Sequence, residues 1–287
     1  MYDADAPETS TCFNVTIQDK IAHIELKRPD AFNSMTRDFW NELPVIINDI
    51  NDHARARVIV ISSTGKHFCA GMDLSVFASA DGVGMSQKSD RETNNENFRH
   101  HVHHLQDTFT CLDKARMPVL VAIQGGCIGG AVDFVSACDI RWASKDAFFC
   151  IQEINIGMTA DVGTFPRLCK LLPDSHIREL AYTGKRMMAE QAKALGLVND
   201  VFDTHEALVT HVMNVARDIA SKAPLAVTGS KVMINYARDH SIADSLDYIA
   251  TWQAGMFAPP QMAEAFRANA AKETGQFPDL LPLRKKM

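Results

Sequence analysis

Three acidic residues stand among apolar and glycine neighbours, where a charged side chain is poorly hydrated. Glu153 and Asp161 lie in CIQEINIGMTADVGTFPRL, residues 150–168, and Asp133 lies in the apolar stretch AVDFV. Carboxyl groups are rarely buried unless they are paired or functional. An apolar pocket raises the pKa of a carboxyl group, which suits proton exchange near neutral pH. The sequence therefore predicts that the three acids transfer protons.

Structural roles would also explain two of these acids. Glu153 could form a salt bridge with a neighbour such as Arg167. Asp161 could cap a helix that follows it, because an aspartate at that position accepts hydrogen bonds from N–H groups two or three residues on. Capping does not exclude catalysis, so both alternatives stay open.

Two glycine loops could hold an oxygen atom that carries negative charge. Residues 65–74, GKHFCAGMDL, follow an apolar strand, and residues 125–131, GGCIGGA, lie between a strand and a helix that begins near Gly129. Backbone N–H groups in such loops can face an anion, although a single glycine-rich loop is more often a tight turn. Cys127 interrupts the G-x-G-x-x-G spacing and no phosphate-binding loop occurs, so a nicotinamide-dependent dehydrogenase is disfavoured.

Other reactive side chains carry weaker signals. His100, His103 and His104 have the spacing of one helix face, which could ligate a metal ion. No cysteine or carboxylate pattern completes such a site, so we expect no metal and a pocket-lining or solvated face. Cys69 and Cys127 lie beside the glycine loops without a motif that would supply a base, and we expect them to be packed.

The elements that position these residues alternate between strands and helices in the first half of the chain. Residues 12–17 and 21–26 predict a hairpin, and a helix opens at NSMT, where Pro44 should kink or restart it. The apolar face of this helix comprises Phe39, Leu43, Ile46, Ile47 and Ile50. Three further runs predict strands buried on both sides: RVIVISS, PVLVAIQ and DIRWAS.

The remaining segments are predicted to be a loop and a helical half. Residues 79–97 have almost no large apolar side chain, so we expect a mobile surface loop. From about Pro173 onward the apolar periodicity is helical, most clearly over 208–223, 225–239, 241–257 and 259–272.

Composition sets the class of protein. With 287 residues and 46% hydrophobic content the chain can bury a full core, and a net charge of -6 disfavours a nucleic-acid partner. We expect no membrane association, no export signal, and seven reduced cysteines in a cytoplasmic protein. The ending LRKKM offers a peroxisome-like alternative, although Lys285 stands where a small residue is expected.

Four stretches together resemble a known family: ELKRPDAFNSM, HFCAGMDL, PVLVAIQGGCIGGAVDFVSACDIRWAS and IQEINIGMTADVGTFPRL. They are similar to the enoyl-CoA hydratase/isomerase (crotonase) superfamily, from about residue 13 to the C-terminal helices. The joint presence of Asp133, Glu153 and Asp161 resembles the Δ3,5-Δ2,4-dienoyl-CoA isomerases most closely. The resemblance implies an α/β crotonase-like spiral of ββα units over 1–200, and a helical C-terminal trimerisation region over 201–287.

The resemblance also implies a reaction and a partner. The substrate would be an acyl-CoA thioester of fatty-acid β-oxidation, with no separate cofactor, and the protein would be a homotrimer or a hexamer built as a dimer of trimers. Glu153 would take a proton from C2 and Asp161 would return one at C6. Asp133 takes the place of the first glutamate of the hydratases. The enolate oxygen would be held in an oxyanion hole by the backbone N–H groups of Met72 and Gly130.

Further residues would bind the substrate according to the same resemblance. These are Ala70, Gly71, Met72, Asp73 and Leu74 along the coenzyme A moiety, together with Gly130. Lys27, Arg28 and Lys66 border this site and would either bind phosphate or face solvent.

Two other functions stay open. The first is a 2-enoyl-CoA hydratase or another acyl-CoA isomerase, with Asp161 as an incidental cap. The second is a crotonase-like RNA-binding protein. RNA binding is disfavoured because the helix TRDFWNELPVIINDINDHA carries Asp38, Glu42, Asp49 and Asp52.

Overall fold

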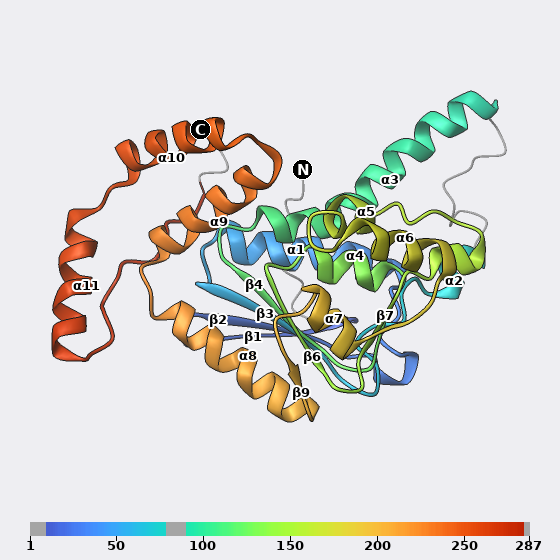
Figure 1. The fold of residues 1–287 in the computed structure, drawn as a ribbon, viewed down its shortest axis with the longest axis horizontal. Helices are drawn as coiled ribbons and strands as arrows, with labels where there is room; N and C mark the ends of the chain where they lie inside the picture. The colour runs from blue at the N-terminus through green and yellow to red at the C-terminus, as the bar shows by residue number, and fades with distance from the viewer. Residues whose placement is uncertain (1–9, 79–89, 284–287) are drawn as a thin grey trace.

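The computed structural model describes residues 10–78 and 90–283. Two sheets form its centre (Figure 1). The larger has the strand order β1 (Phe13–Gln18), β2 (Ile21–Leu26), β3 (Val58–Ser63), β4 (Val119–Ile123), β6 (Ile140–Ser144) and β9 (Val201–Phe202). The smaller contains β5 (Gly126–Ile128), β7 (Phe148–Cys150) and β8 (Met187–Met188). The α/β class is therefore confirmed.

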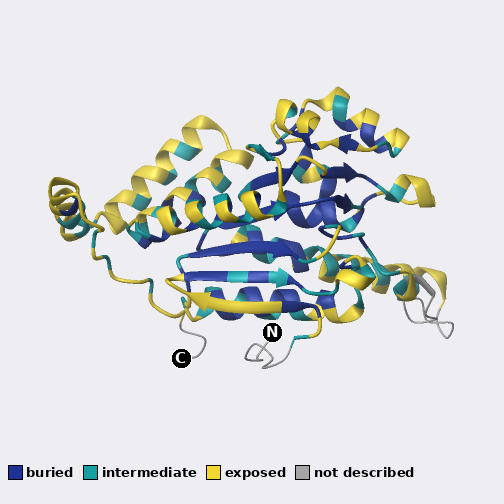
Figure 2. Ribbon diagram, turned by 90° about the horizontal axis from the view of Figure 1, so that it is seen from below, coloured by how far each residue is buried: buried dark blue, intermediate teal, exposed yellow. Residues whose placement is uncertain are grey.

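The N-terminal hairpin is confirmed, and its turn explains its register. Asp19 and Lys20 both have positive φ angles, of 51° and 66°, which a two-residue turn between twisted strands requires. The turn aligns Phe13 with Leu26 across the antiparallel pair. Beyond Phe13, β1 is exposed at the edge of the sheet, as Figure 2 shows.

The strands β3 and β4 are buried on both faces, as expected for parallel strands covered by helices. On β3, Ile59 and Ile61 belong to the main core beneath α1 (Arg37–Asp52), whereas Val58 and Val60 face α8 (His205–Ala220). Figure 1 shows α1 and α8 on opposite faces of the sheet. The carboxyl ends of the parallel strands lead into the glycine loops.

Pro44 lies inside α1, which continues through it, so a restart at this residue is excluded. A proline removes the hydrogen bond to the carbonyl four residues earlier. Here that carbonyl belongs to Trp40, and the Thr108 hydroxyl donates to it at 3.4 Å. The donor comes from α3 (Arg91–Lys114), so packing between the two helices compensates for the proline.

The loop predicted over residues 79–97 is partly wrong. Residues 79–89 lie outside the described residues, but α3 begins at Arg91, so the end of the predicted loop is helical. Asp90 caps this helix by accepting from the N–H and hydroxyl groups of Thr93 at 2.9 and 2.8 Å. The absence of large apolar residues reflects exposure of the first turns of α3, not a lack of helix.

The short helices lie between the strands. They are η1 (Pro29–Ala31), α2 (Leu74–Ala78), α4 (Gly130–Ser136), η2 (Glu153–Ile156), α5 (Thr164–Leu168), α6 (Asp174–Thr183) and α7 (Ala189–Leu195). The helical second half is confirmed by α6 to α11, except that the short strands β8 and β9 interrupt it. Strands this short offer too few residues for an apolar period to be recognised.

The C-terminal helices α9 (Pro224–Asp239), α10 (Ile242–Met256) and α11 (Pro259–Ala271) extend away from the sheet (Figure 1). By contrast, β9 and α8 lie beyond residue 200 yet pack with the sheet. The division at residue 200 stays a prediction. Within the described part of the chain, no helix is long and apolar enough to cross a lipid bilayer.

Candidate active site

The two glycine loops meet through a short parallel bridge between Cys69 and Cys127. The Cys69 N–H donates to the carbonyl of Gly126 at 3.1 Å, and the Ile128 N–H donates to the carbonyl of Cys69 at 3.1 Å. Both cysteines are fully buried, as predicted, and burial raises the pKa of the Cys69 thiol to about 12. These thiols are therefore packed in the core.

The first loop is fixed from its other side by Met35. The Met35 N–H donates to the carbonyl of Gly71 at 2.8 Å, and the Asp73 N–H donates to the carbonyl of Met35 at 3.1 Å. Gly71 has a φ of +82°, and a Cβ atom placed on it would lie 2.6 Å from the Ile128 oxygen and 3.6 Å from the Gly130 nitrogen. Only glycine permits the two loops to approach this closely.

This contact brings the two predicted oxyanion donors into one region. Met72 follows Gly71 directly, and Gly130 is the first residue of α4, where an N–H group has no partner within the helix. Within residues 10–78 and 90–283, neither the Met72 N–H nor the Gly130 N–H donates to a backbone carbonyl. Both donors are therefore available to a ligand oxygen, and their role stays a prediction.

The other residues of the predicted substrate loop either hold the loop in place or are exposed to solvent. The Ala70 N–H donates to the backbone carbonyl of Phe32 at 3.0 Å. The Asp73 carboxylate accepts from the hydroxyls of Ser34 and Ser75, both at 2.6 Å, which lowers its pKa to about 2. Asp73 thus anchors the loop, whereas Leu74 is 81% exposed.

Asp133 lies on α4, one turn after Gly129, and is completely buried. One carboxyl oxygen, Oδ1, accepts from the Thr164 N–H at 2.5 Å. The other, Oδ2, is buried without a hydrogen-bond partner in the described residues. Burial raises the pKa of Asp133 to about 7, and the nearby Glu153 carboxyl adds to the rise.

Glu153 is the first residue of η2, and its carboxyl group lies against the second glycine loop. A Cβ atom placed on Gly129 would lie 3.2 Å from Glu153 Oε1, while Oε2 is buried without a partner among the described residues. Burial raises the pKa of Glu153, and the charge of Asp161 raises it further. The predicted salt-bridge alternative is wrong, because Arg167 pairs with Asp113 at 2.8 Å.

Asp161 is more open than the other two acids. Protein around its carboxyl group still raises its pKa, and His101 opposes that shift. The predicted helix cap is also wrong, because α5 begins at Thr164 and its preceding residue is Gly163. The acid that binds the first N–H of α5 is Asp133, from another helix.

The three acids act on one another electrostatically as well as through burial. Glu153 and Asp161 both raise the pKa of Asp133, and Asp161 raises that of Glu153. Carboxyl groups that share an apolar site do not all ionise easily, so the ionisation of one disfavours proton release from its neighbours. The arrangement is therefore suited to accept and donate protons beside the glycine loops.

Sequence reasoning missed Gln106. Its side-chain Nε2 donates to the backbone carbonyl of Asp161 at 2.7 Å, from the face of α3. Gln106 follows the histidines of this helix in sequence. His103 Nδ1 lies 3.0 Å from Gln106 Oε1, whereas His100 Nε2 lies 2.7 Å from Glu96 Oε1. A single glutamine on a helix gives no sequence signal; the only pointer was the expectation that this face lines a pocket.

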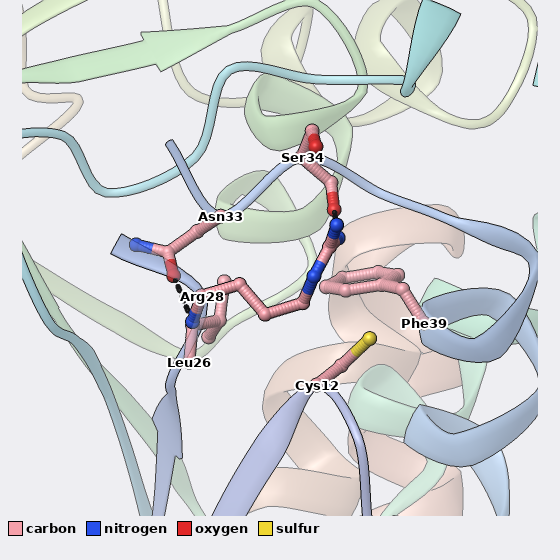
Figure 3. Close-up of a pocket in the computed structure, with 6 residues that line it drawn as sticks. All are labelled: Cys12, Leu26, Arg28, Asn33, Ser34 and Phe39. Atoms are coloured by element: carbon pink, nitrogen blue, oxygen red, sulfur yellow. Dashed lines mark hydrogen bonds between the residues drawn. The ribbon is translucent and has the colours of Figure 1, made fainter. Parts of the chain in front are cut away.

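A small pocket away from these acids explains one of the predicted phosphate ligands. Figure 3 shows Arg28 among its lining residues, turned toward Ser34. The Arg28 Nη1 donates to the Ser34 carbonyl at 2.7 Å, and the backbone N–H of Arg28 donates to Asn33 Oδ1 at 2.9 Å. Arg28 thus supports the segment that holds Asp73, whereas the roles of Lys27 and Lys66 stay predictions.

Comparison with known proteins gives consistent results. Residues 16–278 match the enoyl-CoA hydratase/isomerase family. The chain is 41% identical over 256 residues to the mitochondrial Δ3,5-Δ2,4-dienoyl-CoA isomerase of Mus musculus, covering 89% of this chain and 78% of the relative. It is 37% identical to the peroxisomal enzyme of that name from Arabidopsis thaliana, covering 91% and 93% of the two chains. The crystal structure of an enoyl-CoA hydratase from Bacillus anthracis superposes with a TM-score of 0.81 at 27% identity, covering 93% of this chain and 99% of the other.

Proposed function

The chain belongs to the enoyl-CoA hydratase/isomerase family, and from this premise we propose that it is a Δ3,5-Δ2,4-dienoyl-CoA isomerase of fatty-acid β-oxidation. The observation that carries the proposal is the grouping of Asp133, Glu153 and Asp161 beside two glycine loops, where Glu153 and Asp161 raise the pKa of Asp133 and Asp161 raises that of Glu153. A plain hydration needs carboxylates around one water molecule. A proton shift along a conjugated chain needs acids at separate positions.

The proposed reaction begins with proton loss at C2 of a 3,5-dienoyl thioester. The Glu153 carboxylate takes this proton, and the electron pair spreads from C2 to the thioester oxygen and along the two double bonds. Asp161, protonated at the start, delivers its proton to C6, and the double bonds move to C2 and C4. Because C2 and C6 are four bonds apart, one carboxyl group does not easily reach both.

The negative charge on the thioester oxygen requires donors that are already in place. The N–H groups of Met72 and Gly130 meet this need, since both are close to Gly71 and neither donates to a backbone carbonyl among the described residues. Removing one donor of an oxyanion hole costs roughly 3–4 kcal/mol of barrier height. Residues 70–74 would accommodate the coenzyme A moiety, which is part of the substrate, and no separate cofactor or metal enters the reaction.

The decisive experiment offers two substrates to the purified protein and identifies the products. A 3,5-dienoyl-CoA should give the 2,4-dienoyl-CoA without uptake of water oxygen, and a 2-enoyl-CoA should be hydrated much more slowly. Water addition as the main reaction would replace the isomerase proposal with the 2-enoyl-CoA hydratase. Binding of RNA would be tested by a salt-dependent mobility shift.

The assembly and the compartment belong to the same proposal. We propose a homotrimer, or a hexamer of two trimers, formed through the C-terminal helices. The relatives described above are mitochondrial and peroxisomal by name. The cytoplasmic expectation therefore stays a prediction, and Lys285, on which the peroxisome-like alternative rests, lies outside the described residues.

A further inference from the structure

One face of α3 holds the segment that carries Asp161. Gln106, Thr110 and Asp113 are spaced i, i+4 and i+7, so they lie on the same side of the helix. Gln106 Nε2 donates to the Asp161 carbonyl at 2.7 Å. Arg167 donates to the Thr110 hydroxyl at 3.3 Å and pairs with Asp113 at 2.8 Å. The helix therefore contacts both ends of residues 161–167.

The opposite side of this segment is held by α4. Asp133 Oδ1 accepts from the N–H of Thr164, three residues after Asp161. The short stretch from Asp161 to Thr164 is thus fixed by Gln106 at one end and by Asp133 at the other. Its position does not depend on the turn alone.

The Gln106 contact differs from the others because it is made to the catalytic candidate itself. It uses the backbone carbonyl of Asp161, which leaves the carboxyl group free to face a substrate. Only the amide NH₂ of a glutamine can donate to a carbonyl, so Oε1 faces His103. His103 Nδ1 lies 3.0 Å from that oxygen and must carry a proton to donate to it. The hydrogen bonds from His103 to Gln106 and from Gln106 to Asp161 therefore fix the orientation of the Gln106 amide.

We propose that Gln106 is a positioning residue for proton delivery at the far end of the acyl chain. The inference rests on the proposed isomerase function and extends it to a residue outside the acidic group. In the step concerned, the O–H bond of Asp161 breaks and the electron pair of the C5=C6 bond of the dienolate forms the C6–H bond. Asp161 is left as a carboxylate. Gln106 touches none of the reacting atoms. It fixes the backbone of Asp161, and so the position from which the Asp161 side chain reaches the substrate.

This role predicts that replacing Gln106 slows proton delivery at C6 without slowing proton removal at C2. Gln106→Met keeps the length of the side chain and a good helix former but removes the donor. Exchange of the C2 hydrogen with deuterated solvent depends on Glu153 and should continue at the wild-type rate. Formation of 2,4-dienoyl-CoA depends on Asp161 and should fall about 10- to 100-fold, the effect of a small misplacement of a reacting group. The KM should change little.

Three variants make the comparison specific. Asp161→Asn sets the upper limit of the exchange-to-product ratio. Gln191→Met, the same replacement on the exposed face of α7, should leave the ratio at the wild-type value. Gln106→Glu keeps the shape without the amide donor and should raise the ratio as Gln106→Met does, so it decides the question if the methionine variant does not fold.

The outcomes of this experiment are distinct. A raised ratio in the Gln106 variants, with unchanged circular dichroism, supports the positioning role. A ratio equal to that of the wild type, or an equal fall in exchange and product, overturns it while the isomerase proposal stands. If the wild-type protein forms no 2,4-dienoyl-CoA, the proposed function itself fails, and the inference fails with it.

Discussion

At the scale of single residues, burial raises the pKa of the Asp133 and Glu153 carboxyl groups, so their chemistry depends on their apolar surroundings. Because carboxyl groups are rarely placed among apolar neighbours, the acids were recognisable as candidates in the sequence. Their partners were not, since those partners come from other elements. Nothing in the local sequence indicates that Asp133 accepts a hydrogen bond from the first N–H of α5, or that Arg167 pairs with Asp113. A cap was predicted at Asp161 because it is near in sequence, whereas the acid that fills this role is near in space.

Glu153 supplies the most direct test at this scale. Glu153→Gln keeps the shape of the side chain and removes the base that takes the C2 proton. General base catalysis contributes about 10²- to 10⁴-fold, so kcat should fall by that factor while acyl-CoA still binds. Steady-state kinetics and binding of a non-reactive acyl-CoA measure the two properties separately. A rate near that of the wild type would remove Glu153 from the mechanism.

Asp133 predicts a dependence of stability on pH. Its pKa is about 7 in the folded protein against an ordinary value of 3.8. Between these values the unfolded chain releases the proton and the folded protein keeps it, so stability falls as pH rises through this window. Each pKa unit corresponds to about 1.4 kcal/mol, which makes the total loss a few kcal/mol by pH 8.

The variant Asp133→Asn isolates this effect. Its carbonyl can still accept from Thr164 N–H but the side chain does not ionise. The difference in free energy of unfolding between variant and wild type should therefore shift in favour of the variant between pH 5 and pH 8, as measured by denaturant unfolding. Parallel stability curves would show that Asp133 does not carry the pKa shift. We expect this variant to lose less activity than Glu153→Gln.

At the scale of elements, strands and long amphipathic helices were predictable because burial repeats with a regular period. The hairpin, β3, β4, β6 and α8 to α11 follow this pattern. The first turns of α3 did not, since an exposed polar helix and a polar loop have the same composition. The short strands β8 and β9 were also missed, because two residues establish no period.

The close approach of the glycine loops is the element on which the proposed oxyanion hole depends. Gly71→Ala would place a methyl group 2.6 Å from the Ile128 oxygen and force the loops apart. One misplaced donor lowers kcat by about 10²- to 10³-fold. Gly196→Ala is a matched control, because Gly196 has a similar φ of +90° but its Cβ would meet its nearest neighbour at 3.9 Å.

The two alanine variants should therefore differ in activity more than in backbone strain. Both should lose roughly 1–2 kcal/mol from the positive φ angle, measured by denaturant unfolding. Only Gly71→Ala should also lose most of its turnover. Equal activity in the two variants would argue against a hole formed by Met72 and Gly130.

At the scale of the whole molecule, the C-terminal helices are anchored at both ends but not covered. Lys231 on α9 is buried and pairs with Asp139 at 2.8 Å, which fixes the first helix to the core. After α11 the chain returns, and Asp279 pairs with Arg57 at 2.7 Å. Between these anchors, α10 has no buried residue, and Figure 2 shows the C-terminal helices largely exposed.

The apolar face of α10 supports the proposed assembly and yields a last prediction. Ile242, Leu246 and Ile249 are spaced i, i+4 and i+7, and they are 82%, 62% and 42% exposed. A row of large apolar side chains on one helix face is costly in water and is typical of a surface that binds another chain. Leu246→Asp would place a charge within that surface. Light scattering after size exclusion should give three or six chain masses for the wild type and a smaller mass for this variant. Leu281→Asp, at a leucine outside the helices that is 81% exposed, should keep the wild-type mass. A wild-type protein that is monomeric at micromolar concentration would contradict the assembly, and it would require the face of α10 to bind a different partner.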